Sequence, residues 1–422
     1  MGDGQHGSPA VGSDVGGQTP VRHFLFSPAS SYPIPYASLI DEAGNTTHTW
    51  SNPAEQPYPE DSPPTFLRGW NHVELDRAGD LFAIVPLHCV LKLNRDSRII
   101  WKACVAAHHD LAPLDSGDVY VLTESPRVIT CDGQRLVILD NEITMLSPSG
   151  IPRCVLSLYD VLHSHPVTRA LLIKQVLERR ARFTESGWPE RSGLEARDAV
   201  AVETRALLES GSYSSPLRRA LQLLRQLPGS PCDVIHSNTV EILDEHPRGV
   251  WQRGDLLVSF RNLNMIAVID KARQGVLWTW GDRLLSGQHQ PSALPNGNVL
   301  VFDNGAGVGR SRLLEVNPTC SSIDWEYVAN PPESFFSEVA GGCELLPNGN
   351  ILVTEAQSGR AFQVTKDRRI VWNWTVPAPV SHAGRATIYR LSGVPLETAR
   401  RIIRDGFTEI IEESDPVGAV AG

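Results

Sequence analysis

Histidine recurs at one place in a repeated pattern of this chain, seven or eight residues before a turn glycine. The pattern occurs with this spacing in HVELDRAG from His72, in HDLAPLDSG from His109 and in HQPSALPNG from His289. A fourth histidine, His236, stands before a longer spacer that ends at Gly254. An imidazole titrates near neutral pH, exchanges protons, attacks electrophiles and binds metals. Four imidazoles in matching places therefore predict a shared chemical site.

A second group of polar side chains is suited to holding an anion beside these histidines. Arg261 ends the apolar segment LLVSFR, Arg312 opens RLLEV and Arg390 closes TIYR. A guanidinium offers a planar fork of donors that matches sulfate, phosphate or carboxylate. Asn238 follows His236 by two residues, so in a strand it would share that face and orient the imidazole or bind the anion. His108, next to His109, is expected to point the other way, because strand side chains alternate.

The elements that position these residues are short strands. Each repeat spans about 40 to 50 residues and contains a turn of the Gly-Asp or Asn-Gly-Asn type, an apolar segment such as NVLVF, an alternating segment such as RLLEV, and a tryptophan segment such as SIDWEY. The alternation has period 2, and Asn and Gly adopt the positive φ that such turns require. Four strands in a repeat of this length are typical of a β-propeller blade.

Five blades can be counted, and a sixth can be assembled from the two ends of the chain. Residues 37–50 supply its last two strands, and residues 385–393 supply earlier strands. Joining both ends in one blade closes the ring and removes its open edges. The innermost strand of every blade lines a central channel. The four histidines are therefore expected to converge on the propeller axis.

One stretch departs from the strand pattern. Across residues 157–229 Leu and Ala recur at three- and four-residue spacing, which favours helices. We therefore expect an all-β, six-bladed β-propeller with a helical insertion between blades two and three, packed on the ring or lying over one mouth. The expected organisation is a disordered arm (1–24), a first propeller part (25–156), the insertion (157–229), a second propeller part (230–393) and a short helix with a tail (394–422).

Composition narrows the range of partners. A formal charge of −10 argues against nucleic acid and anionic membranes. No apolar run reaches the roughly 18 residues of a membrane helix. The chain has seven cysteines without a CxxC pair, and its first residues lack the features of a signal peptide. We expect a cytoplasmic protein with reduced thiols that acts on a small molecule; its oligomeric state does not follow from the sequence.

Several motifs together resemble a known family. IHSNTVEIL, GDLLVSFRN, WTWGDRLLSGQHQPSALPNGNVLVFDNG, SRLLEV and LPNGNILVTEAQSGRAFQVT look like those of the arylsulfotransferase family of bacterial six-bladed propellers, over about 36–155 and 230–392. The resemblance implies that a central histidine takes a sulfuryl group from an aryl sulfate and passes it to a phenol, with no cofactor. It also implies catalytic roles for His109, His236 and His289, and sulfate binding by Arg312.

Two departures from the family pattern keep alternatives open. The fifth repeat, GGCELL, has Gly341 in place of a histidine, so a nucleophile belonging to that blade would be missing. His72 is an additional histidine. The residues His72, His109, His236 and His289 are therefore also compatible with an iron, copper or zinc centre of an oxidoreductase or lyase. A third alternative is a propeller that binds a ligand or a protein without catalysis.

Overall fold

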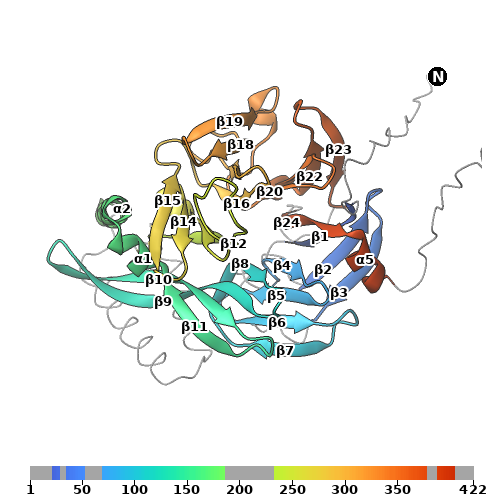
Figure 1. Ribbon diagram of the computed structural model, residues 1–422, viewed down its shortest axis with the longest axis horizontal. Coiled ribbons are helices and arrows are strands. Elements are labelled where there is room, and N and C mark those ends of the chain that lie inside the picture. The colour runs from blue at the N-terminus through green and yellow to red at the C-terminus, as the bar shows by residue number, and fades with distance from the viewer. Residues whose placement is uncertain (1–20, 29–34, 53–68, 186–231, 378–386, 404–422) are drawn as a thin grey trace, which may run out of the picture.

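The fold is a ring of six four-stranded antiparallel sheets. The computed structural model describes residues 21–28, 35–52, 69–185, 232–377 and 387–403. The blades surround a central axis in Figure 1, and the first strand of each blade lies nearest to that axis. The chain is thus an all-β, six-bladed β-propeller, as the repeat predicts.

Blades one and two are consecutive in the chain. Blade one consists of β4 (Val73–Leu75), β5 (Leu81–Val85), β6 (Cys89–Leu93) and β7 (Ile99–Ala103). Blade two consists of β8 (Ala107–Pro113), β9 (Val119–Cys131), β10 (Gln134–Leu146) and β11 (Pro152–Ser157). The strands β9 and β10 each have 13 residues and run past the rim of the ring as a hairpin (Figure 1).

Blades three to five follow the same plan. Blade three has β12 (Ser237–Ile242), β13 (Leu256–Phe260), β14 (Met265–Asp270) and β15 (Gly275–Trp280). Blade four has β16 (His289–Ala293), β17 (Val299–Asp303), β18 (Arg312–Asn317) and β19 (Ser322–Tyr327). Blade five has β20 (Gly342–Leu345), β21 (Ile351–Glu355), β22 (Arg360–Val364) and β23 (Ile370–Thr375). Single 3-10 turns are η2 (Arg261–Leu263), η3 (Pro332–Ser334) and η4 (Ala356–Ser358).

Blade six joins the two ends of the chain, as expected. Its strand order is β24-β1-β2-β3, with β24 (Ile388–Pro395) innermost, followed by β1 (Val21–Pro28), β2 (Tyr36–Asp41) and β3 (Thr46–Ser51). The boundary expected for the N-terminal arm, 1–24, was wrong at its end. Residues from Val21 onward belong to β1, because this apolar segment pairs with both β24 and β2. Residues 1–20 lie outside the described residues.

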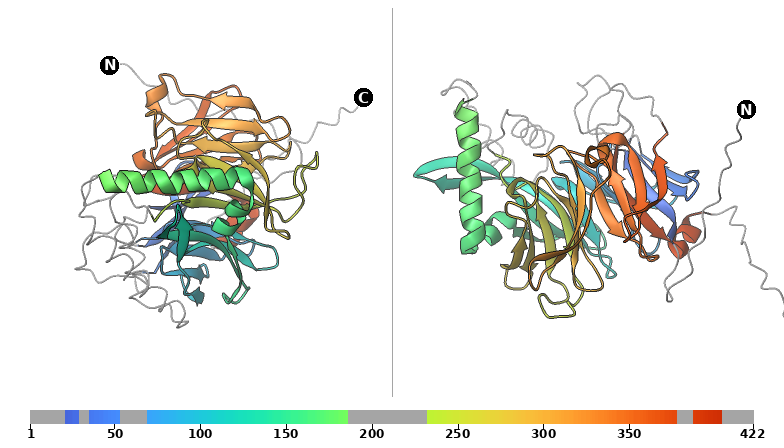
Figure 2. Two further views of the ribbon diagram at one scale, coloured as in Figure 1. Left: turned by 90° about the vertical axis from the view of Figure 1, so that its left-hand side faces the viewer. Right: turned by 90° about the horizontal axis from the view of Figure 1, so that it is seen from above.

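Two helices occupy the start of the predicted insertion. α1 (Leu158–Ser164) is capped at its N-terminus by Ser157, whose side chain accepts a hydrogen bond from the N–H of Asp160. α2 (Pro166–Glu185) follows. In Figure 1 α2 is seen end-on outside the ring, beside blade three, and Figure 2 shows its full length. These two helices therefore do not cover a mouth of the channel. Residues 186–231 lie outside the described residues, so the insertion as a whole stays a prediction.

A third helix, α5 (Leu396–Ile402), follows β24 and represents the expected C-terminal helix, while residues 404–422 lie outside the described part of the chain. None of the described helices is long and apolar enough to cross a membrane.

The turn glycines and the tryptophans of the repeat have separate structural roles. Gly297 adopts φ +84°, and a Cβ there would lie 2.8 Å from His246 Nε2, so the Asn-Gly-Asn turn requires glycine. Three outer-strand tryptophans donate their indole N–H to the following blade. These bonds run from Trp280 to Ser321 O (3.2 Å), from Trp325 to Lys366 O (2.8 Å) and from Trp372 to Glu42 O (2.8 Å). The tryptophan segment thus links adjacent blades at the outside of the ring.

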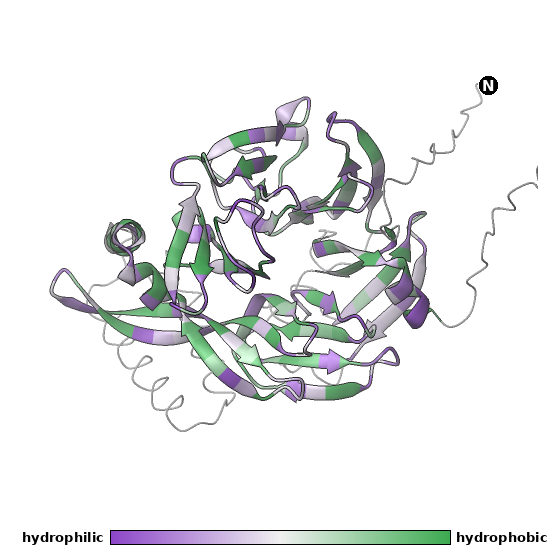
Figure 3. Ribbon diagram, viewed as in Figure 1, coloured by the Kyte–Doolittle hydropathy of each residue, from purple (hydrophilic) through white to green (hydrophobic). Residues whose placement is uncertain are grey.

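The core lies between neighbouring blades. Figure 3 shows apolar residues along the middle strands, and all five residues of β5, β13, β17 and β21 are buried. Between blades five and six Phe24 is fully buried, with its ring centroid 4.9 Å from that of Trp372. The ring therefore closes on an apolar interface to which β1 contributes.

We predict that Phe24→Ala lowers the free energy of unfolding by about 3–5 kcal/mol, because it leaves a cavity between blades five and six. Urea denaturation followed by tryptophan fluorescence measures this loss. The control is Val371→Ala in β23, whose side chain is 44% exposed and whose loss should cost far less. Equal stability of the wild type and Phe24→Ala would show that β1 does not hold the ring closed.

Candidate functional site

The inner strands of blades two, three and four are irregular where the histidines lie. The pairings of β8 with β9, β12 with β13 and β16 with β17 each contain a register shift. His109, His236 and Gln290 adopt positive φ angles of 57°, 51° and 41°. Such conformations are costly for side chains with a Cβ and are often found at functional sites. The pairing of β4 with β5 in blade one has no such shift in the described structure.

His289 is a buried, neutral imidazole of defined tautomer. Its Nδ1 is 2.7 Å from Asn304 Oδ1 and 3.0 Å from Gly287 O. The Asn304 amide donates to Ser337 O and Ala340 O, which fixes its oxygen toward His289. Both partners of Nδ1 are acceptors, so this network assigns the proton to Nδ1 and the lone pair to Nε2. Burial, followed by the charge of Arg261, lowers the pKa of His289 to about 3.

His109 lies beside two other histidines. Its ring centroid is 4.7 Å from that of His236, and its Nδ1 is 2.8 Å from His108 Nδ1. Nε2 of His108 faces Thr123 O at 3.1 Å and must donate to it. With both rings neutral, Nδ1 of His108 accepts and Nδ1 of His109 donates, which leaves the lone pair of His109 on Nε2. The expectation that His108 points away from His109 was wrong, because the positive φ of His109 breaks the alternation of the strand.

His236 is paired with a carboxylate. Its Nδ1 is 2.5 Å from Asp233 Oδ2, and both residues precede β12. A carboxylate at this nitrogen holds the proton on Nδ1, orients the ring and stabilises the imidazolium that forms when Nε2 takes up a proton. The charge of His236 acts on His289 and lowers the pKa of the latter. His109, His236 and His289 therefore form one group, which we call the histidine cluster.

Arg261 and Arg390 supply positive charge to the histidine cluster. Both lower the pKa of His289, with Arg261 the stronger of the two. Arg261 begins η2 at the end of β13 and donates to Asn262 Oδ1 at 3.2 Å. Arg390, on the innermost strand of blade six, is 7% exposed and donates to Asp110 Oδ1 at 3.0 Å. The cluster thus combines the neutral imidazole of His289 with two guanidinium groups.

Two of the predicted anion-binding residues have other roles. Arg312 lies on the third strand of blade four and donates to Asp303 (2.8 Å), Glu326 (3.0 Å) and Leu284 O (2.7 Å). Its donors are engaged by these acceptors, so it holds strands of its own blade together. Asn238 is fully buried and donates to Gln288 O at 2.8 Å, joining blades three and four. The bulge at this residue removes it from the face of His236.

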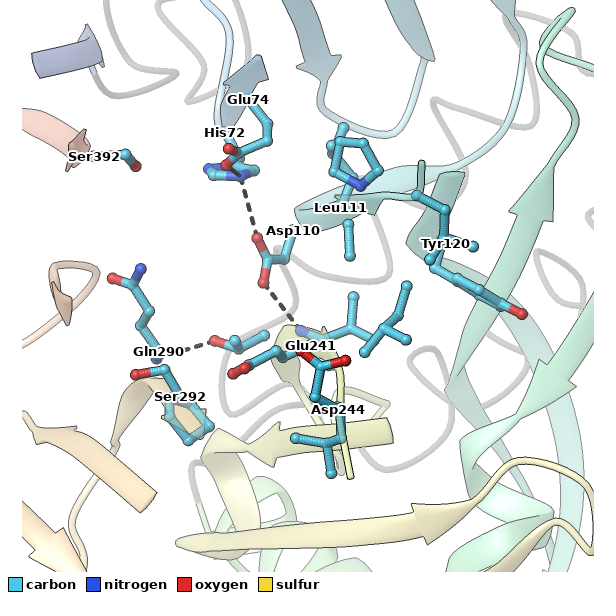
Figure 4. Close-up of a pocket in the computed structure, with 18 of the residues that line it drawn as sticks. His72, Glu74, Asp110, Leu111, Tyr120, Glu241, Asp244, Gln290, Ser292 and Ser392 are labelled. Atoms are coloured by element: carbon cyan, nitrogen blue, oxygen red, sulfur yellow. Dashed lines mark hydrogen bonds and ion pairs between the residues drawn. The ribbon is translucent and has the colours of Figure 1, made fainter. Parts of the chain in front are cut away.

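His72 does not join the histidine cluster, so the expected ring of four imidazoles was wrong. It belongs to a second group, in which Nε2 lies 3.3 Å from Asp110 Oδ1 and 3.4 Å from Glu74 Oε2 (Figure 4). Blade one lacks the bulge that shifts the inner strands of blades two to four. Within the described residues, no three or more His, Cys, Asp or Glu side chains are arranged to hold a metal.

This second group borders a cavity of about 730 Å³ (Figure 4). The cavity is lined by residues of the innermost strands of all six blades, among them His72, Asp110, Glu241, Ser292, Glu344 and Arg390. Asp110 connects several of these strands, because its Oδ1 accepts from Arg390 and its Oδ2 accepts from the N–H of Val240 at 3.0 Å. Arg390 adjoins both groups, since it binds Asp110 and also lowers the pKa of His289.

Blade five has no room for a histidine at the matching place. Gly341 adopts φ +84°, and a Cβ there would lie 2.6 Å from Thr354 O. At Gly342 a Cβ would overlap the side-chain amide of Gln290 from blade four. The glycine pair is therefore required by the backbone conformation and by the close approach of Gln290.

Sequence reasoning missed several residues that hold the site together. Asp233 lies in a loop, and only its offset of three residues from His236 marks it. Asn304 resembles an ordinary turn residue, although it fixes the tautomer of His289. Tyr389 precedes Arg390 and donates from its hydroxyl to His109 O at 2.9 Å. Its position on an innermost strand could have identified it.

The architecture and the histidine cluster define a six-bladed propeller with a polar channel. The sequence model of the arylsulfotransferase (ASST) family matches residues 212–376, which include His236, Arg261 and His289. Together with the six-bladed ring, this match supports assignment of the chain as a distant ASST-type member. No curated protein matches the chain.

Several solved structures are similar to the chain over most of its length. A protein of unknown function from Bacteroides caccae is 13% identical with a TM-score of 0.46, covering 88% of this chain and 98% of that one. A streptogramin B lyase is 10% identical with a TM-score of 0.41, covering 88% and 98%. The β-propeller domain of Cps50 (Swd1) from Myceliophteria thermophila is 6% identical with a TM-score of 0.42, covering 88% and 90%. None of these likenesses bears on the activity of the chain.

We predict that Asp110→Asn lowers the free energy of unfolding by about 3–5 kcal/mol, because it leaves the buried Arg390 guanidinium without its carboxylate. Adding Arg390→Met to Asp110→Asn should recover part of this loss, and urea denaturation of the four proteins in the cycle measures the coupling. The control is Asp115→Asn, which breaks the exposed pair with Arg77 at 2.9 Å and should cost at most about 1 kcal/mol. Equal costs for the Asp110 and Asp115 variants would contradict the prediction.

Proposed function

We propose that the protein transfers a sulfuryl group from an aryl sulfate to a phenolic acceptor through His289. The observation that carries this proposal is the state of His289, a neutral imidazole with its lone pair on Nε2, near Arg261 and Arg390. A neutral imidazole is a competent nucleophile toward sulfur, and nearby guanidinium groups stabilise the oxyanions of the transition state. The match of the arylsulfotransferase (ASST) family over residues 212–376 supports the same chemistry.

In the first half of the proposed reaction, Nε2 of His289 attacks the sulfur atom of the aryl sulfate. A nitrogen–sulfur bond forms, and the bond between sulfur and the aryl oxygen breaks. The departing aryl oxygen takes a proton from His236, whose imidazolium form Asp233 stabilises. The products are a phenol and a sulfohistidine at position 289.

In the second half, the hydroxyl oxygen of an acceptor phenol attacks the same sulfur atom. The nitrogen–sulfur bond breaks, and His289 returns to its neutral form. The proton of the acceptor hydroxyl passes to Nε2 of His236, which restores the starting state. The ring of His109 lies against that of His236, so we assign to His109 the role of exchanging protons with His236.

Arg261 is the guanidinium that we assign to the sulfate oxygens. It is partly exposed, and its charge has the larger effect on His289. Arg390 is held by Asp110, so its contribution is a fixed positive field rather than a movable hydrogen-bond donor. We propose that the ester approaches from the side of Arg261, because the cavity beside His72 is lined with carboxyl groups that disfavour an anion.

The reaction as proposed uses no metal and no organic cofactor. Metal analysis of the purified protein tests this point. Near-stoichiometric iron, copper or zinc that is lost in a His289→Ala variant would favour the metal-centre alternative instead. We also propose a cytoplasmic location, supported by seven free cysteines, which are typical of proteins from reducing compartments.

We predict that His289→Ala lowers the rate of transfer from 4-nitrophenyl sulfate to phenol about 10³-fold or more, because it removes the attacking nitrogen. His236→Ala should lower the rate by about 10²–10⁴-fold through loss of proton transfer. Release of 4-nitrophenolate, followed by absorbance, measures both rates. Intact mass spectrometry after a short exposure to the ester should detect one added SO₃ group in the wild type and none in His289→Ala.

The matched control is His163→Ala, which removes an exposed histidine of α1 that stacks on Tyr159. This variant should keep the wild-type rate. Equal activity of His289→Ala and His163→Ala would remove His289 from the mechanism. A wild-type protein that turns over no aryl sulfate and acquires no SO₃ group would overturn the proposed function.

A further inference from the structure

The cavity beside His72 has carboxylates at a fixed place in alternate blades. Glu74 pairs with Phe82, Glu241 with Leu257 and Glu344 with Leu352. In each case the partner is the second residue of the next strand, so the three glutamates occupy one level of blades one, three and five. At that level blades two and four have Ala112 and Ser292. The counterpart in blade six is Ser392, because the N–H of the next residue, Gly393, donates to Glu344 as that of Ala293 donates to Glu241. At this level, the cavity wall therefore presents a carboxylate on every second blade.

The three glutamates have no cationic side chain as a partner. Among the described residues, no Lys or Arg forms an ion pair with Glu74, Glu241 or Glu344. The other carboxylates that line the cavity are paired in the structure, Asp110 with Arg390, Asp244 with Arg253 and Asp115 with Arg77. Lys271 lies over the ring of Tyr120, 4.7 Å from its centroid. The three glutamates thus have no direct cationic partner, although the charge of Arg390, which binds Asp110, lowers the pKa of Glu74 and of Glu344.

Backbone contacts account for two of the glutamates but not for the third. Glu241 accepts from the N–H of Ala293 in the next blade at 3.1 Å, and Glu344 accepts from that of Gly393 at 3.0 Å. The corresponding residue next to Glu74 is Pro113, which has no N–H. Glu74 accepts from the N–H of Leu75 in its own strand and lies 3.4 Å from Nε2 of His72 in the same blade. A role in linking blades therefore explains Glu241 and Glu344 in part, and leaves Glu74 unexplained.

His72 provides a second, independent indication of a ligand. It lines the cavity and is 1% exposed, yet neither of its ring nitrogens has a hydrogen-bond partner of good geometry in the described structure. Burial lowers the pKa of His72 to about 3, so the ring is neutral and one nitrogen is an acceptor. A buried polar group without a partner is costly, and a bound donor would satisfy it.

We propose that this cavity binds an organic cation with two or more ammonium groups, of the linear polyamine class, through Glu74, Glu241 and Glu344. Each ammonium N–H donates to a carboxylate, and His72 accepts from the same ligand. The cavity volume of about 730 Å³ is within the usual range for small-molecule sites. No group of described residues is arranged around a single metal ion, so separate carboxylates suit several spaced ammonium groups better. The site is distinct from the histidine cluster and does not depend on sulfuryl transfer.

The proposal has a defined pH dependence. Burial raises the pKa of Glu74 to about 7, of Glu241 to about 8 and of Glu344 to about 7. A bound cation favours their ionised forms, so binding releases protons near pH 7 and tightens as the pH rises from 6 to 8. The other titratable or charged groups that face the cavity are the Asp110–Arg390 and Asp244–Arg253 pairs, Asp115, Tyr120, Lys271 and His72. His72 stays neutral throughout this range because its pKa is far lower.

Calorimetric titration of the full-length protein with spermidine at low salt tests the proposal. We expect saturable binding of one spermidine per chain at pH 8, weaker binding at pH 6, and proton release shown by a dependence of the heat on the buffer. Glu241→Gln and Glu344→Gln should each weaken binding at least about tenfold. Ser292→Lys, which places an ammonium group among the carboxylates, should abolish it. Thermal unfolding checks that each variant is folded.

The control Glu333→Gln makes the same change of charge at an exposed residue of η3, and it should leave the affinity unchanged. The proposal is overturned if spermidine does not bind saturably, or if Glu333→Gln weakens binding as much as Glu241→Gln, since either result indicates general attraction to an acidic protein. Magnesium that binds with the same dependence on Glu241 and Glu344 would also overturn it. Binding is measured without turnover, so a protein inactive toward aryl sulfates can still bind spermidine.

Discussion

The channel depends on the carboxylate of Asp110. The innermost strand of a blade has a neighbouring strand on one side only, so its free backbone groups need side-chain partners. Asp110 belongs to blade two, accepts from the backbone of blade three and from Arg390 of blade six, and lies beside His72 of blade one. One buried side chain thereby fixes four of the six inner strands relative to one another. His109, its neighbour in the chain, is positioned by the same contacts.

The irregular backbone around the histidine cluster is held by buried amides. Asn141 Oδ1 accepts from the N–H of Ser237 at 2.5 Å, next to the left-handed His236. Gln288 donates to Phe260 O at 3.2 Å and to Met265 O at 2.9 Å, which anchors the segment before His289. Hydrogen bonds of this kind replace those that a bulged strand loses, so the imidazoles keep defined positions despite the strained φ angles.

The sequence determines the ring more clearly than the site. Period-2 alternation and regular turns predict six blades, including the blade built from both ends, because they reflect local geometry. The start of β1 at Val21 follows instead from pairing with distant strands. Three of the four predicted histidines lie together. His72 lies apart, because blade one lacks the bulge that is present in the inner strands of blades two to four. The sequence does not reveal such a bulge, since the spacing between histidine and glycine is the same with or without it. The sequence also could not show that Arg312 is unavailable for binding an anion, because its ion pairs with Asp303 and Glu326 form only in the folded chain.

The cavity end of the channel has a different rotational order from the ring around it. Glutamates of blades one, three and five alternate there with small residues of blades two, four and six, which are Glu74, Glu241 and Glu344 against Ala112, Ser292 and Ser392. The backbone repeats every sixth of a turn, whereas the carboxylates repeat every third of a turn. The unit that builds this end of the channel is therefore a pair of blades. A side chain in an odd-numbered blade and its counterpart in an even-numbered blade therefore meet different surroundings.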